Sequence, residues 1–190
     1  MKLGLFGGSF DPIHLGHLLV ACAAREEAAL DRIFFIPAAQ SPFKASATSA
    51  SAEERLRLVR LALAGDASAE VDDSEVRRGG ISFSIDTVRD YQKRFPGAEL
   101  FYLIGADQTA QLHLWREANE LARLAQFLVI PRPGEATAEL APPFCGKALV
   151  GFPFGVSSTE IRRRIKARLP VEHLVPATVA EAIKNNGLYL

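Results

Sequence analysis

The residues best suited to chemistry begin at two adjacent glycines near the amino terminus, Gly7 and Gly8. Because glycine has no side chain, backbone N–H groups there can approach a ligand closely, and a helix start nearby adds roughly half a positive charge. His14 and His17 follow, spaced so that both imidazoles lie on one side of a helix. Backbone donors beside imidazoles suit a phosphate, although the segment matches neither the GxGxxG nor the GxxxxGK[ST] motif.

Two other interpretations of His14 and His17 remain open: a helix cap with a surface residue, or a two-point metal site. No nearby glutamate or third ligand has the spacing of an HExxH motif, so no metal site in the protein is predicted. The histidines directly follow the segment Gly-Gly-Ser-Phe-Asp-Pro, and this context favours the phosphate interpretation.

A second polar cluster lies near the carboxyl terminus and also marks a helix start. Ser157, Ser158 and Thr159 supply hydroxyl groups, and a glutamate at capping-box spacing follows. Ser158 and Arg162 share one helix face because they are four residues apart, as do Thr159 and Arg163. The plain alternative is an ordinary capped helix with solvated basic residues. For Ser158, Thr159 and Arg162, we favour an anion site.

The charge of the whole chain limits the classes of partner. Its 22 Lys and Arg residues balance 22 Asp and Glu residues, so no global field attracts nucleic acid or an anionic membrane surface. Five cations between residues 162 and 168 could suggest nucleic-acid contact, but no aromatic residues are interleaved with them. We therefore predict neither a nucleic-acid partner nor a membrane partner.

Length and composition favour one compact domain over residues 1–190. With 190 residues and 48% hydrophobic content, the chain can bury a substantial core. Its two cysteines, Cys22 and Cys145, suggest neither a disulfide framework nor a zinc site. The amino-terminal segment does not have the pattern of a signal peptide. The apolar runs of the chain are far shorter than the roughly 20 residues of a membrane span. A cytoplasmic protein is expected, with its oligomeric state open and a homo-oligomer compatible.

The pattern of apolar residues predicts strands alternating with helices. Strands are expected at residues 2–6, 32–36, 69–71, 100–104, 127–130 and 148–150. Helices are expected after His14, over about 53–64, along an apolar side that includes Ile85 and Val88, from Ser157 onward and over 178–186. The segment 45–52 contains only Ala, Ser and Thr and is predicted to be a linker, with a lid over the site as the open alternative because the segment lies near a strand end.

This alternation predicts an α/β fold, a Rossmann-like doubly wound parallel sheet with a small helical carboxyl-terminal region from about residue 157 to residue 190. In such a sheet, the loops after the strands share one edge, where ligands bind. The unusual residues nearly all follow strands. They are Gly7, Gly8 and Ser9, Gly105 and Asp107, Arg132, and the hydroxyl cluster Ser157–Thr159.

The order of the motifs is specific enough to suggest a family. Residues 7–17 (GGSFDPIHLGH) and 157–162 (SSTEIR) resemble the two signatures of the HxGH nucleotidylyltransferase superfamily. Segments between and after them resemble bacterial nicotinate-nucleotide adenylyltransferases: residues 82–87, 105–108 and 132–134, Trp115, and the ending from Leu174 to Tyr189. The likeness spans nearly the whole chain.

The resemblance implies a reaction in which ATP and nicotinate mononucleotide give deamido-NAD and pyrophosphate, with Mg²⁺ accompanying ATP. The 5′-phosphate of the mononucleotide attacks the α-phosphorus of ATP directly, so the protein aligns the reactants and stabilises charge. By this likeness the catalytic residues are His14, His17 and Arg162. The implied ATP-binding residues are Gly7, Gly8, Ser9, Phe10, Lys44, Gly105, Asp107, Ser157, Ser158, Thr159 and Arg162.

The resemblance also implies that Ser84, Trp115 and Arg132 bind nicotinate mononucleotide. Ser84 is expected at a helix amino terminus, whose free N–H groups attract a carboxylate and reject an amide. For Trp115, the role of a core anchor is an equal alternative. Three positions depart from the family pattern: Phe83 and Ser84 replace the more usual Tyr and Thr, and Phe43 precedes Lys44 where the family often has His. The last change puts the role of the loop around Lys44 in question.

Other functions compete with this one. A related HxGH enzyme would join ATP to nicotinamide mononucleotide or to pantetheine phosphate, and a non-catalytic nucleotide sensor would keep the glycines without needing the histidines. A class I aminoacyl-tRNA synthetase is disfavoured because the chain has no KMSKS segment and lacks the length for a tRNA-binding domain. No Ser-His-Asp constellation supports covalent acyl chemistry.

Overall fold

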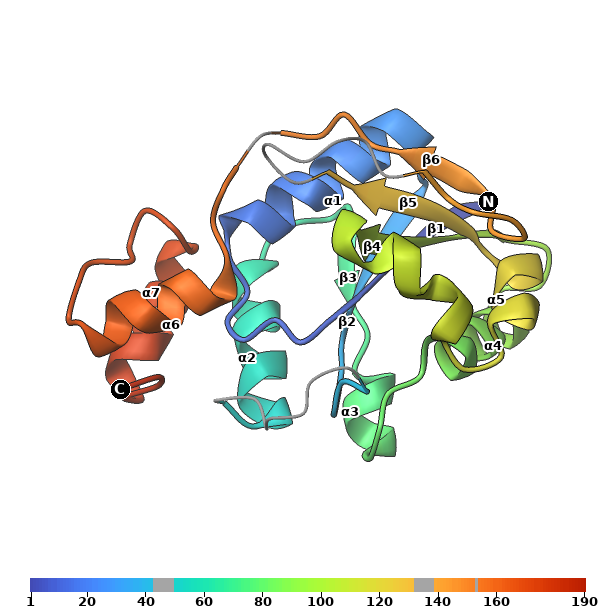
Figure 1. Ribbon diagram of the computed structural model, residues 1–190. Coiled ribbons are helices and arrows are strands. Elements are labelled where there is room, and N and C mark those ends of the chain that lie inside the picture. Colours follow the sequence, from blue (N-terminus) through green and yellow to red (C-terminus); the bar gives the residue numbers. More distant parts are fainter. Residues whose placement is uncertain (43–49, 132–138, 153) are drawn as a thin grey trace.

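Six parallel strands form one sheet in the order β3-β2-β1-β4-β5-β6 (Figure 1). The computed structural model describes residues 1–42, 50–131, 139–152 and 154–190. Chain order reverses between β1 and β4, which is the topological switch point of a doubly wound sheet. The strands are β1 (Lys2–Gly8), β2 (Arg32–Pro37), β3 (Ala69–Val71), β4 (Glu99–Gly105), β5 (Gln126–Ile130) and β6 (Gly146–Ala148).

Buried side chains alternate along the strands and so build a core on each face of the sheet. Ile33 and Phe35 of β2 enter one core, while Phe34 and Ile36 enter the other. This alternation follows from the two-residue period of a strand. The helices that cover the two faces are α1 (Leu15–Ala28) and α2 (Ala52–Ala62) on one side, and α4 (Ser84–Arg94) and α5 (Ala118–Leu124) on the other.

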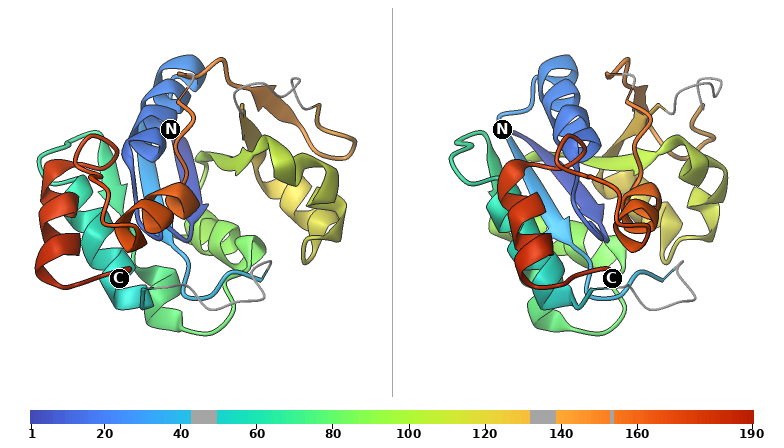
Figure 2. Two further views of the ribbon diagram at one scale, coloured as in Figure 1. Left: turned by 60° about the vertical axis from the view of Figure 1, so that its left-hand side comes forward. Right: turned by 90° about the vertical axis from the view of Figure 1, so that its left-hand side faces the viewer.

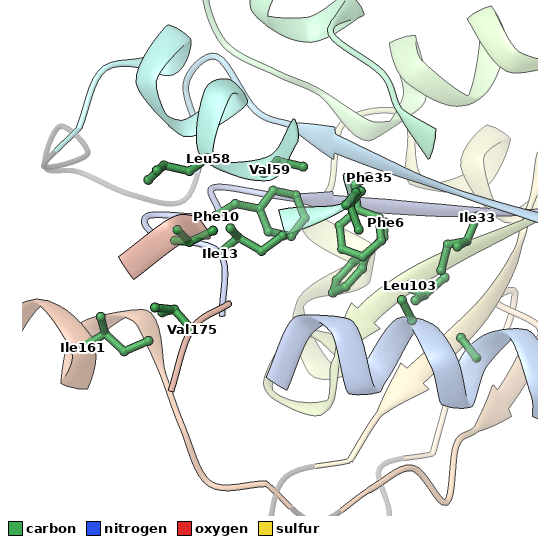
Figure 3. Close-up of a cluster of buried hydrophobic side chains, with 14 of the residues drawn as sticks. Phe6, Phe10, Ile13, Ile33, Phe35, Leu58, Val59, Leu103, Ile161 and Val175 are labelled. Carbon is green, nitrogen blue, oxygen red and sulfur yellow. The ribbon is translucent and has the colours of Figure 1, made fainter. Parts of the chain in front are cut away.

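The carboxyl-terminal region packs beside α2 at one edge of the molecule (Figure 2). It contains α6 (Ser158–Lys166) and α7 (Ala177–Asn185). Ile161 of α6 and Val175 join the same buried cluster as Phe10 and Ile13 of the segment after β1 (Figure 3). The last and the first parts of the chain are therefore held together by a shared apolar core.

The predicted fold class is confirmed: an α/β, Rossmann-like, doubly wound parallel sheet with a small helical carboxyl-terminal region. Several boundaries were wrong. Strand β1 continues through Gly7 and Gly8, which were expected in a loop, and β6 spans Gly146–Ala148 rather than residues 148–150. Residues 50–52 belong to an ordered helix start, with Ser51 capping α2, whereas residues 45–49 of the predicted linker lie outside the described residues.

Three short elements were not predicted: α3 (Ser74–Arg78), the 3₁₀ helix η1 (Ala106–Leu114) and α5. The first ends at Arg78, directly before Gly79 and Gly80. Helices α3 and α5 have five and seven residues, too few to establish a helical apolar period, and η1 follows the three-residue turn of a 3₁₀ helix. No helix within the described ranges is long and apolar enough to cross a membrane.

Candidate active site

The switch point of the sheet brings the predicted glycines to one edge. Gly7 and Gly8 end β1, and Gly105 ends the neighbouring strand β4. The Gly8 carbonyl accepts a hydrogen bond from Ala38 N–H at 2.9 Å, which ties the end of β1 to the end of β2. The site therefore starts from three strand ends whose positions are fixed by the sheet.

The segment after β1 is anchored by the side chain of Phe10. This residue has a φ of 47°, an uncommon value for a residue with a side chain, and its ring is buried against Phe6 and Phe35. No backbone hydrogen bond from Phe10 N–H is found among the described residues. The buried ring offsets the strained backbone and leaves this N–H as a donor for a ligand.

A buried arginine that was not predicted holds the carbonyl groups of the same segment. Arg55 of α2 is fully buried and donates to the carbonyl oxygens of Ser9 at 2.6 Å and Ala38 at 2.7 Å. It also donates to Ala39 and Ala50 carbonyls. Because C=O and N–H point in opposite directions across a trans peptide plane, binding the Ser9 carbonyl turns Phe10 N–H away from Arg55. Arg55 thus acts as a positioning residue for the segment.

The two histidines stack on each other at the start of α1. His14 is the residue before the first helical residue, and its ring centroid lies 3.7 Å from that of His17. His17 Nδ1 accepts a hydrogen bond from His14 N–H at 3.1 Å. The predicted placement of both imidazoles on one side is confirmed.

His14 is buried, and this burial lowers its pKa to about 4. Its imidazole is therefore neutral at pH 7 in the free protein. Its Nδ1 atom is buried without a hydrogen-bond partner among the described residues. The atom lies beside Gly16 of α1, so His14 belongs to the start of the helix as a capping residue as well as to the site.

The start of α6 lies against the segment after β1, as predicted from the two motifs. Ser158 Oγ donates to the Pro12 carbonyl at 2.9 Å, and Arg162 donates to the Asp11 carbonyl at 2.8 Å. Ser157 caps the helix by accepting from Glu160 N–H. The two motifs are 146 and 151 residues apart along these bonds, and the fold brings them into direct contact. We call Gly7–His17 together with Ser157–Arg162 the phosphate end.

The side chains of α6 form pairs three residues apart. Thr159 Oγ1 accepts from Arg162 at 3.3 Å, and Arg163 forms an ion pair with Glu160 at 2.7 Å. Thr159 and Arg163, which were expected to share a helix face, thus bond to different partners. Arg162 faces the site and Arg163 faces solvent.

A cavity of about 180 Å³ extends from the phosphate end toward α4. Its wall includes Gly7, Gly8 and Ser9 on one side and Ser84 and Trp115 on the other. Other lining residues are Glu75, Ser82, Tyr102 and Gln108. We call Ser84, Tyr102 and Trp115 the pyridine end. The cavity joins residues that the sequence predicted separately for ATP and for the mononucleotide.

Ser84 is the first residue of α4, so it lies at a helix amino terminus as predicted. Its hydroxyl donates to the Tyr102 hydroxyl at 2.9 Å. Trp115 ends η1 and packs edge-on against Tyr102, with ring centroids 6.1 Å apart. Trp115 lines the cavity and also packs on the core, so its role as a core anchor is confirmed, while its contact with the mononucleotide stays a prediction.

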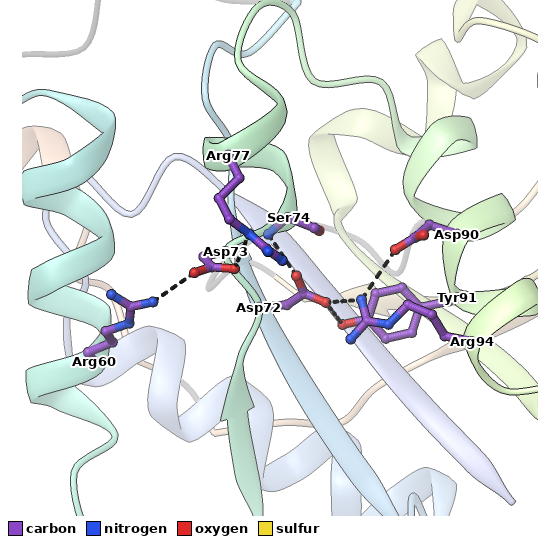
Figure 4. Close-up of polar contacts among 8 residues, drawn as sticks. All are labelled: Arg60, Asp72, Asp73, Ser74, Arg77, Asp90, Tyr91 and Arg94. Carbon is purple, nitrogen blue, oxygen red and sulfur yellow. Dashed lines mark hydrogen bonds and ion pairs between the residues drawn. The ribbon is translucent and has the colours of Figure 1, made fainter.

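A polar network away from the cavity braces the elements of the pyridine end (Figure 4). Asp72 accepts from Tyr91 at 2.6 Å and Arg94 at 2.5 Å, both on α4, and from Ser74 N–H at the start of α3. Burial alone would raise the pKa of Asp72, but these hydrogen bonds outweigh it and hold the pKa at about 2. The ionised carboxylate therefore ties β3, α3 and α4 together.

The remaining predicted residues fall in different places. Asp107 follows Gly105 at the start of η1, and its carboxylate folds back close to that glycine. Lys44 and Arg132, with Phe43, lie outside the described residues. No group of three or more His, Cys, Asp or Glu side chains suited to a metal ion occurs in the described part of the chain.

Three residues of the site were missed in the sequence. They are Arg55, Asp11, whose carboxylate accepts from Ala50 N–H at 3.2 Å, and Tyr102. The sequence does contain a sign of the role of Arg55, because this charged residue lies on the apolar side of α2 beside Leu56, Leu58 and Val59. Tyr102 carries another, since it places a hydroxyl inside an otherwise apolar strand.

Comparisons with known proteins agree with the geometry. Residues 5–164 match the sequence model of the cytidylyltransferase-like family. A protein of Opitutus terrae, named a probable nicotinate-nucleotide adenylyltransferase, is 42% identical over the whole of this chain and 98% of its own length. A Thermus thermophilus protein of the same name is also 42% identical, with both chains fully covered. The fold also matches Plasmodium falciparum nicotinic acid mononucleotide adenylyltransferase complexed with NaAD, with a TM-score of 0.79 at 16% identity, over 99% of this chain and 97% of the other.

Proposed function

The chain belongs to the cytidylyltransferase-like family and, within it, to the nicotinate-nucleotide adenylyltransferases, and from this membership we propose that it joins ATP and nicotinate mononucleotide into deamido-NAD with release of pyrophosphate. This is a nucleotidyl transfer of NAD biosynthesis. The cytoplasmic location and a homo-oligomeric state stay predictions.

One observation carries the proposal. Ser158 and Arg162 bind the carbonyl groups of Pro12 and Asp11, so the two motifs form one structure, and its first residues, Gly7–Ser9, line the cavity that reaches Ser84 and Trp115. A polyphosphate at the phosphate end and a pyridine ring at the pyridine end would thus be held side by side. Adenylyl transfer needs this arrangement of its two substrates.

The phosphate end supplies donors for the triphosphate. The Ser9 and Pro12 carbonyls are bound by Arg55 and Ser158, so the N–H groups beyond them are available to phosphate oxygens. Gly7, Gly8 and Phe10 belong to the same surface. Ser157, Thr159, Gly105, Asp107 and Lys44 are further proposed ATP contacts.

His14, His17 and Arg162 are the proposed catalytic residues, because they flank the same segment and present nitrogen donors. A bound triphosphate raises the pKa of His14 from its value of about 4, since negative charge favours the imidazolium form. A protonated imidazole then stabilises the charge that moves onto pyrophosphate as the bond to the α-phosphorus breaks.

The reaction is a direct displacement. An oxygen of the mononucleotide 5′-phosphate forms a bond to the α-phosphorus of ATP, and the bond from that phosphorus to the pyrophosphate oxygen breaks. No side chain is covalently modified. Mg²⁺ enters bound to ATP, where it neutralises phosphate charge, and the protein contributes alignment.

The pyridine end would select the mononucleotide. Ser84 lies at the start of α4, where unpaired helix N–H groups attract a carboxylate. Trp115 offers an aromatic edge to the ring, and Arg132 is a further proposed contact.

A panel of acceptors tests the proposal. Folded protein with saturating Mg-ATP is offered nicotinate mononucleotide, nicotinamide mononucleotide or pantetheine phosphate, and the product is identified by mass. We expect deamido-NAD and pyrophosphate in equal amounts from the first. Faster turnover of another acceptor would assign the related HxGH enzyme, and ATP binding by calorimetry without any product would assign the nucleotide sensor.

A further inference from the structure

Two hydroxyl groups meet inside the wall of the cavity, at the pyridine end. Ser84 Oγ, on the first residue of α4, lies 2.9 Å from Tyr102 Oη, on β4. The Tyr102 side chain is 6% exposed, and both residues line the cavity. Burial raises the pKa of Tyr102, so the phenol keeps its proton.

The position of the Tyr102 hydroxyl depends on a glycine of the neighbouring strand. A Cβ atom at Gly7 would lie 2.5 Å from Tyr102 Oη and 3.3 Å from its Cζ. The hydroxyl therefore occupies the space that any other residue at position 7 would fill. This close approach explains why glycine is needed there, at the junction between the phosphate end and the pyridine end.

The hydroxyl groups of Ser84 and Tyr102 together have one O–H donor that their mutual hydrogen bond does not use. Two hydroxyls carry two protons, and the bond between them uses one. No further acceptor for either hydroxyl occurs among the described residues. One O–H is therefore available to a ligand from a largely buried position, and a carboxylate, which only accepts, is its best partner.

A neighbouring acid bears on which ligand fits. Glu75 lines the same cavity, is 3% exposed, and accepts from Thr87 Oγ1 at 2.5 Å. Burial raises the pKa of Glu75 despite the hydrogen bonds from Thr87 and Ser82, which lower it. Burial therefore disfavours the charged form of Glu75, which is the form that would repel an anionic ligand.

We propose that Tyr102 is a specificity-determining residue, whose hydroxyl, held over Gly7 and bonded to Ser84, helps bind the carboxylate of the pyridine mononucleotide and so favours the acid over the amide. An amide has one oxygen acceptor and an NH₂ donor, so it satisfies fewer of the donors gathered here. This inference rests on the proposed function and deepens it.

The test compares Tyr102→Phe with the unmodified protein at saturating Mg-ATP. We expect kcat/KM for nicotinate mononucleotide to fall by roughly 10- to 100-fold, the scale of a hydrogen bond to a charged group. Turnover of nicotinamide mononucleotide and the KM for ATP stay nearly unchanged, so the acid-to-amide preference falls. An unchanged preference in the folded variant would overturn the inference.

Tyr91→Phe is the matched control, because Tyr91 is an equally buried tyrosine whose hydroxyl bonds Asp72 and does not line the cavity. Its preference is expected to match that of the unmodified protein. Where Tyr102→Phe folds poorly, Ser84→Ala removes the half-buried hydroxyl that orients the Tyr102 hydroxyl, so a smaller fall in preference is expected, and an unchanged preference would contradict the role of the hydroxyl pair. If the unmodified protein turns over neither mononucleotide, the proposed function fails instead.

A double-mutant cycle with Gly7→Ala tests the geometry independently. The added methyl group meets Tyr102 Oη in the unmodified background, so kcat/KM is expected to fall steeply. In the Tyr102→Phe background the nearest atom is absent, and the same substitution is expected to have a smaller effect. Equal effects in both backgrounds would contradict the position assigned to the hydroxyl.

Discussion

The phosphate end and the pyridine end are built in different ways. At the phosphate end, short contiguous motifs supply the chemical groups and, with Arg55 of α2, the bonds that position them, such as those from Ser158 and Arg162 to the carbonyls of residues 12 and 11. At the pyridine end, single residues from β4, α4 and η1 meet, and the bracing network around Asp72 lies outside the cavity. Charge stabilisation thus depends on local sequence, whereas ligand selection depends on packing.

The largest expected effect is a loss of turnover that leaves mononucleotide binding nearly unchanged. His17→Ala is expected to lower kcat by roughly 10²–10³, the scale of one preorganised charge-stabilising donor, with little change in the KM for nicotinate mononucleotide. Steady-state kinetics measure both. His173→Ala, which alters an exposed histidine that does not line the cavity, is the control. Normal turnover in the His17 variant would remove this residue from the mechanism.

A smaller effect is expected from the residue that holds the phosphate end in shape. Arg55→Met leaves buried carbonyl groups without donors, so the free energy of unfolding should fall by about 3 kcal/mol. The KM for ATP should rise more than that for the mononucleotide. Arg60→Met removes an exposed ion pair with Asp73 and should change stability by less than about 0.5 kcal/mol. If both variants lost the same free energy of unfolding, Arg55 would not be a positioning residue.

The bracing of the pyridine end gives a pH-dependent prediction. The pKa of Asp72 is about 2 in the folded protein, below its ordinary value of 3.8, so its ionised form stabilises the fold above about pH 4. Asp72→Asn should lower the free energy of unfolding by about 2 kcal/mol at pH 7, measured by denaturant titration. The deficit should shrink as pH falls from about 4 toward 2, because the unmodified carboxyl then also loses its charge. A deficit independent of pH would show that charge is not its source.

The smallest expected effect is the uptake of protons by the protein when Mg-ATP binds. Because burial lowers the pKa of free His14 to about 4 and phosphate charge raises it, Mg-ATP binding near pH 6 should take up a fraction of a proton. Calorimetry in buffers of different ionisation enthalpy measures this uptake. His14→Gln should reduce it, while equal uptake by both proteins would assign the proton to another group.

The same comparison explains which parts could be predicted from the sequence. The strands were predictable from their apolar runs, α1 from its apolar period and α6 from its capping pattern, and the contact between the two motifs followed from strand ends sharing an edge. Elements α3 and η1 were not, since they are short and aperiodic. Glu75 lies on α3, and Trp115 directly follows η1. The wall of the pyridine end was therefore predictable only through family resemblance.

The buried polar residues of the site also could not be predicted from the sequence. Arg55 and Tyr102 act through partners that are distant in sequence, and no spacing rule relates Arg55 to the carbonyl of Ser9 or Tyr102 to Gly7. Their environment exists only after the strands and α2 have packed. Burial and hydrogen-bond partners, rather than residue type, identify them.

The release of pyrophosphate at saturating Mg-ATP, followed while nicotinate mononucleotide is titrated, tests most directly whether the two ends serve one reaction. We predict no release without the acceptor, saturable release with it, and one deamido-NAD formed per pyrophosphate. Release at the same rate without the acceptor, or none from folded protein at any acceptor concentration, would contradict that claim.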